Sequence, residues 1–294
     1  MTASSRGKDH DGKERGRIAF QGSLGAYSEI ACGLFAPDLD PLPCGSFDAA
    51  LDAVTEGRAI QAMLPVENSL AGRVADIHRL LPETDLQIIA EHFLSIRHQL
   101  LTLPGVDLKD VRRVRSHAMA LGQCLGVINE LGMEAEAAGD TAGAAKRLAE
   151  TGERTEAVIA SARAAELYGL QVARANVEDA GHNTTRFLLM AREPADVEPG
   201  EGPIVTSFVF QVRNIPAALY KALGGFATNG VNMTKLESYM REGSFTATMF
   251  YADVEGHPED PPLRRALEEL SFFSSSFKVL GVYRADARRL EIGG

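Results

Sequence analysis

The chain contains no tryptophan and only three cysteines, and both shortages narrow the kind of protein it can be. Cys32, Cys44 and Cys124 form neither a CxxC pair nor a Cys/His ligand spacing, so no disulfide framework and no zinc site is expected. Long apolar runs are also missing, since none approaches the roughly 18 residues of a membrane helix. Residues 1–16 lack an apolar signal region, and we therefore expect a cytoplasmic protein with a disordered N-terminal tail.

Basic charge is scarce as well. With a net charge of -10 over 294 residues, the chain lacks the basic face of a nucleic-acid-binding protein. An anionic ligand would have to be held by local groups, such as an arginine or a helix N-terminus, rather than by the overall field. The content of 45% hydrophobic and 24% charged residues is that of a globular protein with one large or two medium domains.

Strand and helix patterns alternate from residue 17 to residue 192, which predicts an α/β sheet architecture with helices on its faces. We expect two lobes around a cleft, one of residues 17–93 plus 185–192 and the other of residues 94–184. A linker rich in proline, glycine and acidic residues follows at 193–203. Residues 204–284 then show the βαββαβ order of a ferredoxin-like domain, and 285–294 form a tail.

The first candidate site stretch is Gln21–Glu29, where two glycines follow the strand of residues 17–20. Glycines at a strand-to-helix turn allow the backbone to approach a ligand, and the helix N-terminus favours an anion. The GxGxxG spacing of dinucleotide sites is absent. Taken alone, the turn is equally well explained as a structural element.

Two further stretches carry polar residues after predicted strands. Asn68 and Ser69 follow the strand of residues 59–64, at the edge where α/β sheets present ligand-binding groups, although they could equally cap a helix. Ser116 is predicted to cap a helix that runs through Gln123 to residue 131. Their spacing of seven residues would place both on one face of that helix. An N-cap serine and a solvated glutamine are the structural alternative.

The fourth stretch is Asn183–Phe187, directly before the last strand of this part of the chain. Arg186 can bind a carboxylate through two parallel hydrogen bonds, and the Thr185 hydroxyl can donate or accept one. A turn in which Asn183 and Thr184 cap their own backbone explains the same residues without a function.

Together these stretches resemble prephenate dehydratase with a C-terminal ACT regulatory domain, from Arg17 to about Arg284. The resemblance implies a two-lobed, periplasmic-binding-protein-like catalytic domain followed by a ferredoxin-like ACT domain. It implies that the catalytic residues are Thr185, Asn68, Ser116 and Gln123. The implied substrate-binding residues are Arg186, Ser23, Gly25, Ala26, Glu67, Ser69, Thr184 and Phe187.

The reaction implied by the resemblance removes CO2 and the ring hydroxyl from prephenate and gives phenylpyruvate in phenylalanine biosynthesis. The resemblance implies neither a metal nor an organic cofactor. Hydroxide leaves poorly unless it is protonated or strongly hydrogen-bonded, and a threonine is a weak acid, so Thr185 is expected to act as a hydrogen-bond donor. Arg186 and the backbone amides of residues 23–26 are the expected anchors for the two carboxylates of prephenate.

The sequence departs from the family pattern at several positions. Asp140 stands where the family commonly has serine, and Ala118-Met119 replaces Pro-Gln after Ser116-His117. In the ACT segment, Ala217 replaces glycine, and Tyr239-Met240 replaces Arg-Pro. The family's phenylalanine site, formed between paired ACT domains, corresponds to Ala217, Ala218, Leu219, Asn232, Glu237 and Ser238. Inhibition by phenylalanine is therefore expected, with its strength open.

Two alternatives stay open at this level. Arogenate dehydratase performs the same chemistry on the amino-acid counterpart of prephenate, and no residue in the sequence decides between them. A non-catalytic, two-lobed amino-acid sensor would use the same architecture for binding alone. A fused chorismate mutase is not expected, because residues 1–16 are too few for a helical domain. We expect a homodimer or homotetramer, in keeping with the closed symmetry usual for oligomers.

Overall fold

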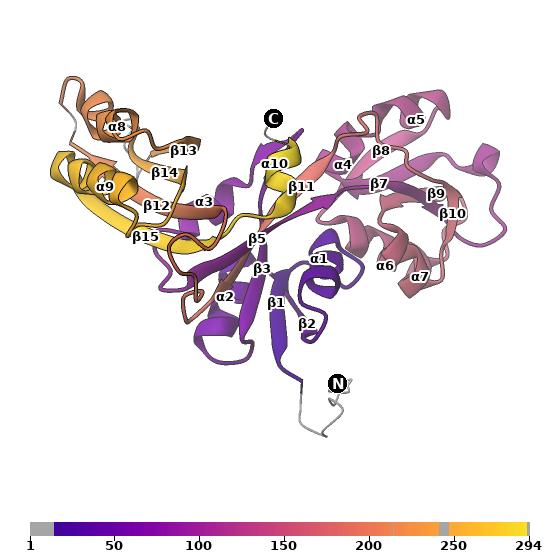
Figure 1. Cartoon of the computed structure of the whole chain (residues 1–294). Helices are drawn as coiled ribbons and strands as arrows, with labels where there is room; N and C mark the ends of the chain where they lie inside the picture. The colour runs from indigo at the N-terminus through magenta and orange to yellow at the C-terminus, as the bar shows by residue number, and fades with distance from the viewer. Residues whose placement is uncertain (1–14, 214, 241–246, 293–294) are drawn as a thin grey trace. The chain divides into compact units, whose positions relative to one another are not determined.

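The computed structural model describes residues 15–213, 215–240 and 247–292 (Figure 1). They divide into two compact units, one of residues up to Val74 with Leu94–Phe187, the other of Ala75–Phe93 with residues from Leu188 onward. Nearly all of the predicted disordered tail lies outside the described residues. Residues 75–93 were expected in the first lobe, but they pack with the second unit.

The first unit begins with a parallel sheet that confirms the predicted α/β class. Its order is β2-β1-β3, and β11 lies beside β3. The second strand was not predicted, because it contains Pro41 and Pro43; its place at the edge of the sheet explains why both are tolerated. The elements are β1 (Arg17–Gln21), α1 (Tyr27–Phe35), β2 (Asp40–Cys44), α2 (Phe47–Thr55), β3 (Gln61–Asn68), β4 (Gly72–Arg73) and β11 (Thr184–Ala191).

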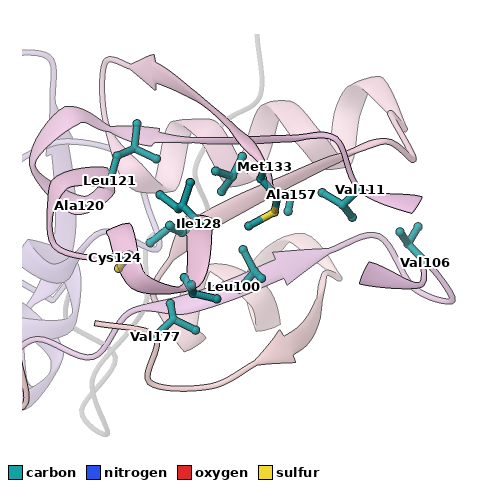
Figure 2. Close-up of a cluster of buried hydrophobic side chains, with 13 residues drawn as sticks. Leu100, Val106, Val111, Ala120, Leu121, Cys124, Ile128, Met133, Ala157 and Val177 are labelled. Carbon is teal, nitrogen blue, oxygen red and sulfur yellow. The ribbon is translucent and has the colours of Figure 1, made fainter. Parts of the chain in front are cut away.

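A second sheet in this unit has the order β10-β6-β9-β7-β8 and is covered by helices on both faces. The central strand β9 is buried throughout. Ala157 and Ile159 face a core with α4 and α5 (Figure 2), while Val158 and Ala160 face α6 and α7. The elements are β6 (Gln99–Thr102), η1 (Leu108–Asp110), β7 (Arg113–His117), α4 (Ala118–Gly122), α5 (Leu125–Glu130), β8 (Glu134–Ala138), α6 (Thr141–Thr151), β9 (Glu156–Ala160), α7 (Ala162–Tyr168) and β10 (Gln171–Arg174).

The second unit contains the βαββαβ order predicted for residues 204–284. Its antiparallel sheet has the strand order β13-β14-β12-β15, and α8 and α9 pack on one face of it. Phe208 in this core stacks on Phe226, with ring centroids 5.9 Å apart. The elements are β12 (Ile204–Val212), α8 (Ala218–Thr228), β13 (Met233–Met240), β14 (Ala247–Glu255), α9 (Pro261–Phe273) and β15 (Ser274–Arg284).

Three further elements complete this unit: α3 (Ala75–Leu80), β5 (Gln87–Ser95), which runs into the first unit, and α10 (Ala287–Ile292). Gly281 on β15 lies so close to Ile88 that an added Cβ would be 2.1 Å from the Ile88 carbonyl oxygen. Residues 285–294 were predicted to be a tail, and this was wrong for the described part. Helix α10 is held in place because Arg289 donates to both oxygens of the buried Glu91 carboxylate, from Nε at 2.6 Å and from Nη2 at 2.5 Å.

Ala217 precedes α8 with φ +60, a left-handed conformation that glycine adopts without strain. An L-residue pays about 1–2 kcal/mol there, partly offset by the greater backbone entropy of glycine in the unfolded chain. Ala217→Gly is therefore expected to raise the free energy of unfolding by about 1 kcal/mol, measured by urea denaturation. Ala222→Gly, inside α8, is the control and should lower it by at least as much. A destabilised Ala217→Gly variant would contradict this explanation.

Candidate active site

The ends of β3 and β11 are joined by Ser69. Its backbone N–H donates to the Thr184 carbonyl oxygen (2.8 Å), and its hydroxyl donates to the His182 carbonyl oxygen (2.9 Å). The Thr184 backbone N–H donates to the same hydroxyl oxygen (3.0 Å). Ser69 and Thr184, both predicted to bind substrate, thus hold residues 68 and 185 side by side although the two are 117 positions apart.

Asn68 makes the central hydrogen bonds of the site. Its Oδ1 accepts from the backbone N–H groups of Leu70 (3.0 Å) and Ala71 (2.9 Å), which fixes the orientation of the amide. Its Nδ2 therefore faces Thr185 and donates to Oγ1 at 3.0 Å. A threonine hydroxyl that accepts this bond still has its own proton to donate. The predicted role of Thr185 as a hydrogen-bond donor is consistent with this geometry.

Asn183 connects these residues to Gln123. Asn68 Nδ2 donates to Asn183 Oδ1 (2.7 Å), and Asn183 Nδ2 donates to Gln123 Oε1 (2.9 Å). Asn183 is only 2% exposed. The sequence suggested no more than a turn for it, although its place directly before Thr184-Thr185 was a signal. Gln123 is held by the next residue, Cys124, which lies fully buried in the core of Figure 2.

The structure corrects the expectation for Ser116. This residue is the fourth of β7, not a helix cap, and α4 begins after His117, whose ring accepts from the Met119 N–H. Since α4 ends at Gly122, Ser116 and Gln123 do not share a face of one helix. The Ser116 side chain is fully buried and its hydroxyl donates to the Ile159 carbonyl oxygen on β9 (2.5 Å). Its predicted catalytic role has no support from this position.

The glycine turn is also used differently from the expectation. The Gly25 N–H donates to the Glu29 carboxylate (2.8 Å) and the Ala26 N–H to the Ser23 carbonyl oxygen (3.1 Å), so these two amides are already engaged. The turn is also held by the N-terminus of α7, because the hydroxyl of its N-cap Ser161 donates to the Gly25 carbonyl oxygen (2.6 Å). Gly25 has φ +91, and an added Cβ would be 3.0 Å from the Ala164 Cα, so only glycine fits.

A cavity of about 520 Å³ lies against the beginning of this turn. Lys146 is the cation among its lining residues. Asp140, whose carboxylate also lines it, caps α6 by accepting from the Gly143 N–H, the task that serine performs at such positions. The lining residues are Gln21, Gly22, Ser23, Leu24, Pro43, Cys44, Gly45, Asp140, Lys146, Leu167 and Tyr168.

Other predicted substrate residues lie inside the strands. Arg186 is 5% exposed and Phe187 is 1% exposed in β11, and Glu67 is half-buried in β3. Consecutive residues of a strand point to opposite faces, so Arg186 does not extend from the face that carries Thr185. The expected anchoring of a substrate carboxylate by Arg186 is not favoured by this burial and orientation.

The predicted effector residues lie in the second unit. Ala217, Asn232 and Ser238 are exposed, Leu219 and Glu237 are half-buried, and Ala218 is buried. Lys235 pairs with the Glu237 carboxylate at 3.3 Å. Directly after Ser238, the Tyr239 hydroxyl lies 2.7 Å from Nδ1 of His78, a residue of α3 that is 1% exposed. Tyr239, which stands where the family has arginine, thus has a hydrogen-bond partner in the same unit.

Residues 18–195 match the model of the family described as prephenate dehydratase. A relative from Komagataeibacter europaeus, named bifunctional N-acyl-homoserine lactone acylase/prephenate dehydratase, is 56% identical over 92% of this chain and 97% of its own. Arogenate dehydratase/prephenate dehydratase 2 of Arabidopsis thaliana is 40% identical over 94% of this chain and 74% of its own.

A solved structure of a prephenate dehydratase has a similar fold. This structure, of prephenate dehydratase from Arthrobacter aurescens in complex with L-Phe, has a TM-score of 0.83 and 30% identity, and the match covers 91% of this chain and 89% of the other. Among the described residues, no helix has the length and apolar character of a membrane span.

Asn68, Gln123, Asn183 and Thr185 form one hydrogen-bonded set, here called the Thr185 network. All four lie within the matched family segment, and the chain belongs to the prephenate dehydratase family.

Proposed function

We propose that the Thr185 network is where this lyase converts prephenate to phenylpyruvate. The observation that carries the proposal is the hydrogen bond from Asn68 Nδ2 to Thr185 Oγ1, because it leaves the hydroxyl proton of Thr185 to be donated. A donated hydrogen bond to the ring hydroxyl of the substrate makes that hydroxyl a better leaving group. The loss of CO2 and the gain of aromaticity then drive the elimination.

We propose that the cavity beside the glycine turn receives one substrate carboxylate. Lys146 supports this, because its ammonium is the cation at a cavity that Gly22 and Ser23 also line. The backbone amides of Gly25 and Ala26 are not proposed to bind this carboxylate, since both donate within the protein. Ser69, Thr184, Glu67 and Phe187 are proposed to act by holding β3 and β11 in place.

The substrate test uses the purified full chain with prephenate and with arogenate in separate assays. Phenylpyruvate from prephenate is the expected product. Phenylalanine formed faster from arogenate would assign the chain to the second substrate, as the name of the Arabidopsis relative allows, with the same site. The absence of product from both would favour the amino-acid sensor.

A second candidate activity is the hydrolysis of N-acyl homoserine lactones. The observation that favours it is the 56% identity, across nearly the full length of both chains, with a relative whose name includes that acylase. The three cysteine thiols are unsuited as nucleophiles: burial raises the pKa of Cys32 and of Cys124 to about 12, and burial also raises that of Cys44. Release of homoserine lactone by the purified chain tests this activity separately.

We propose that phenylalanine inhibits the enzyme by binding an ACT domain formed by residues 204–284, in a homodimer or homotetramer. The βαββαβ order supports the domain assignment, and the L-Phe complex of the Arthrobacter relative supports the effector. A cytoplasmic location remains a prediction.

We propose that the hydrogen bond between Tyr239 and His78 couples β13, which carries the proposed effector residues Glu237 and Ser238, to the segment that matches the family model. Tyr239 follows the proposed effector residues of β13, and His78 lies within the segment that matches the family model. Tyr239→Phe removes this bond and keeps the ring, so it is expected to raise the half-inhibitory concentration of phenylalanine by about threefold or more. Without phenylalanine, kcat should stay within about twofold.

The matched control is Tyr220→Phe, because Tyr220 lies 81% exposed on α8. It should be inhibited at the same phenylalanine concentration as the wild type. If Tyr239→Phe also behaves like the wild type, the bond does not couple β13 to catalysis.

A further inference from the structure

A half-buried tyrosine and a buried histidine extend the Thr185 network beyond the residues of the proposed function. His98 is 3% exposed, with Nε2 3.0 Å from Gln123 Oε1 and Nδ1 2.8 Å from the Tyr27 hydroxyl. The two rings meet edge to face, with centroids 5.5 Å apart.

Two backbone N–H groups fix the direction of the hydrogen bonds that run from Asn68 through Asn183 to Gln123 and His98 Nε2. The N–H groups of Leu70 and Ala71 make Asn68 Oδ1 an acceptor, so the Asn68 amide nitrogen donates to Asn183 Oδ1. Asn183 must then donate through its own nitrogen to Gln123 Oε1. An amide oxygen can only accept, so His98 Nε2 carries the proton that is shared with Gln123.

The same direction holds on the other side of the Gln123 amide. Its Nε2 points at Asn68 Oδ1, 3.4 Å away, which is consistent with an amide whose oxygen faces His98 and Asn183. A Gln123 amide turned by half a rotation would place its N–H groups against the N–H of His98. The imidazole therefore favours, together with the Asn183 amide, one of two orientations of the half-buried Gln123 amide that are nearly equal in shape.

We propose that His98, held by Tyr27, is a positioning residue of the proposed reaction. By donating from Nε2, it holds Gln123 in the orientation that accepts from Asn183, and so keeps Asn183 in place against Asn68, the partner of Thr185. This inference rests on the proposed function.

The surroundings of His98 favour the form that this role requires. Burial lowers the pKa of His98 below its ordinary 6.5, although its hydrogen bond with Gln123 and the Glu178 carboxylate oppose the shift, so the ring is neutral at pH 7. Burial raises the pKa of Tyr27 well above 10, so its hydroxyl keeps its proton, which the Arg97 carbonyl oxygen (2.9 Å) and His98 Nδ1 (2.8 Å) share. Glu178 accepts from the His98 backbone N–H (2.9 Å) and from Arg97 (2.9 Å), which holds the segment carrying the ring.

The test compares two variants with phenylpyruvate formation from prephenate by the full chain. His98→Leu removes the donor and is expected to lower kcat about 10- to 100-fold, with KM within about threefold, because the reacting groups are misaligned but still present. His98→Gln keeps an N–H donor at the position of Nε2 and should recover most of that loss. The control Gln99→Leu removes a buried polar group next to His98, outside the network, and should keep kcat within about twofold.

A double-mutant cycle separates positioning from general stabilisation. In a Gln123→Leu background, His98→Leu is expected to lower kcat by less than about threefold, because the amide that it orients is gone. Equal losses in both backgrounds, or a His98→Leu enzyme with near-normal kcat, would overturn the inference. A wild-type chain that forms no phenylpyruvate would overturn the proposed function instead, so the two failures are distinct.

Discussion

Thr185→Ala is expected to lower kcat for phenylpyruvate formation by about 10²–10⁴-fold, the range of a lost general-acid contribution. Thr185 is 9% exposed, its hydroxyl accepts from Asn68, and the proposed role of that hydroxyl is to donate to the leaving hydroxyl of the substrate. That hydrogen bond strengthens as the C–O bond breaks, so its loss affects the transition state more than binding. KM should therefore remain within about threefold, as measured by steady-state kinetics.

The matched variant is Thr185→Ser, which keeps the hydroxyl and removes a methyl group. It should retain kcat to within about tenfold, since the serine hydroxyl can accept from Asn68 and donate as threonine does. Equal thermal unfolding of the two variants would show that the fold is not the cause. A Thr185→Ala enzyme with near-normal kcat would make Thr185 a structural residue and move the proposed chemistry elsewhere.

Arg289→Met is expected to lower the free energy of unfolding by about 3–5 kcal/mol, as for the loss of one partner from a buried ion pair. The Glu91 side chain is fully buried, and each of its carboxylate oxygens accepts a hydrogen bond from the Arg289 guanidinium. The buried Asp253 carboxylate lies 3.6 Å from the same group. The variant leaves two carboxylates in a dry environment without the guanidinium that they share, and urea denaturation measures the cost.

The comparison variant is Arg284→Gln. Its ion pair with Glu201 is exposed, with side-chain exposures of 61% and 41%, so the loss should be below about 1 kcal/mol. Replacing both Glu91 and Arg289 by Leu and Met should restore much of the lost stability, because the pair rather than either charge is tolerated in the core. If Arg289→Met is no less stable than Arg284→Gln, α10 contributes little to the unit.

Local chemistry in the sequence determined most of the secondary structure. Ser46, Asp140 and Ser161 are residue types that favour N-caps, and each side chain accepts the backbone N–H three residues on. Gly152 ends α6 in the left-handed conformation that favours glycine. These features depend on residues within one helical turn, and the sequence displays that information directly. The resemblance of separate motifs to one family likewise needed only their order.

The tertiary structure decided which of the candidate residues meet. Asn68 reaches Thr185 and Asn183 across more than 100 positions, while Ser116 is held by Ile159 and the Gly25 amide by Glu29. Each polar group had several acceptable partners in the sequence. Folding selects among them because a buried donor or acceptor must be satisfied in place.

The contribution of His98 was hidden for the same reason. A lone histidine in an apolar run carries no sign of its partners, and the direction of its hydrogen bond depends on two backbone N–H groups some 30 residues earlier. The sequence by itself determined most of the elements, their order and the family of this protein. Only the tertiary structure decided which way each amide of the site points, because that choice belongs to a network closed in three dimensions.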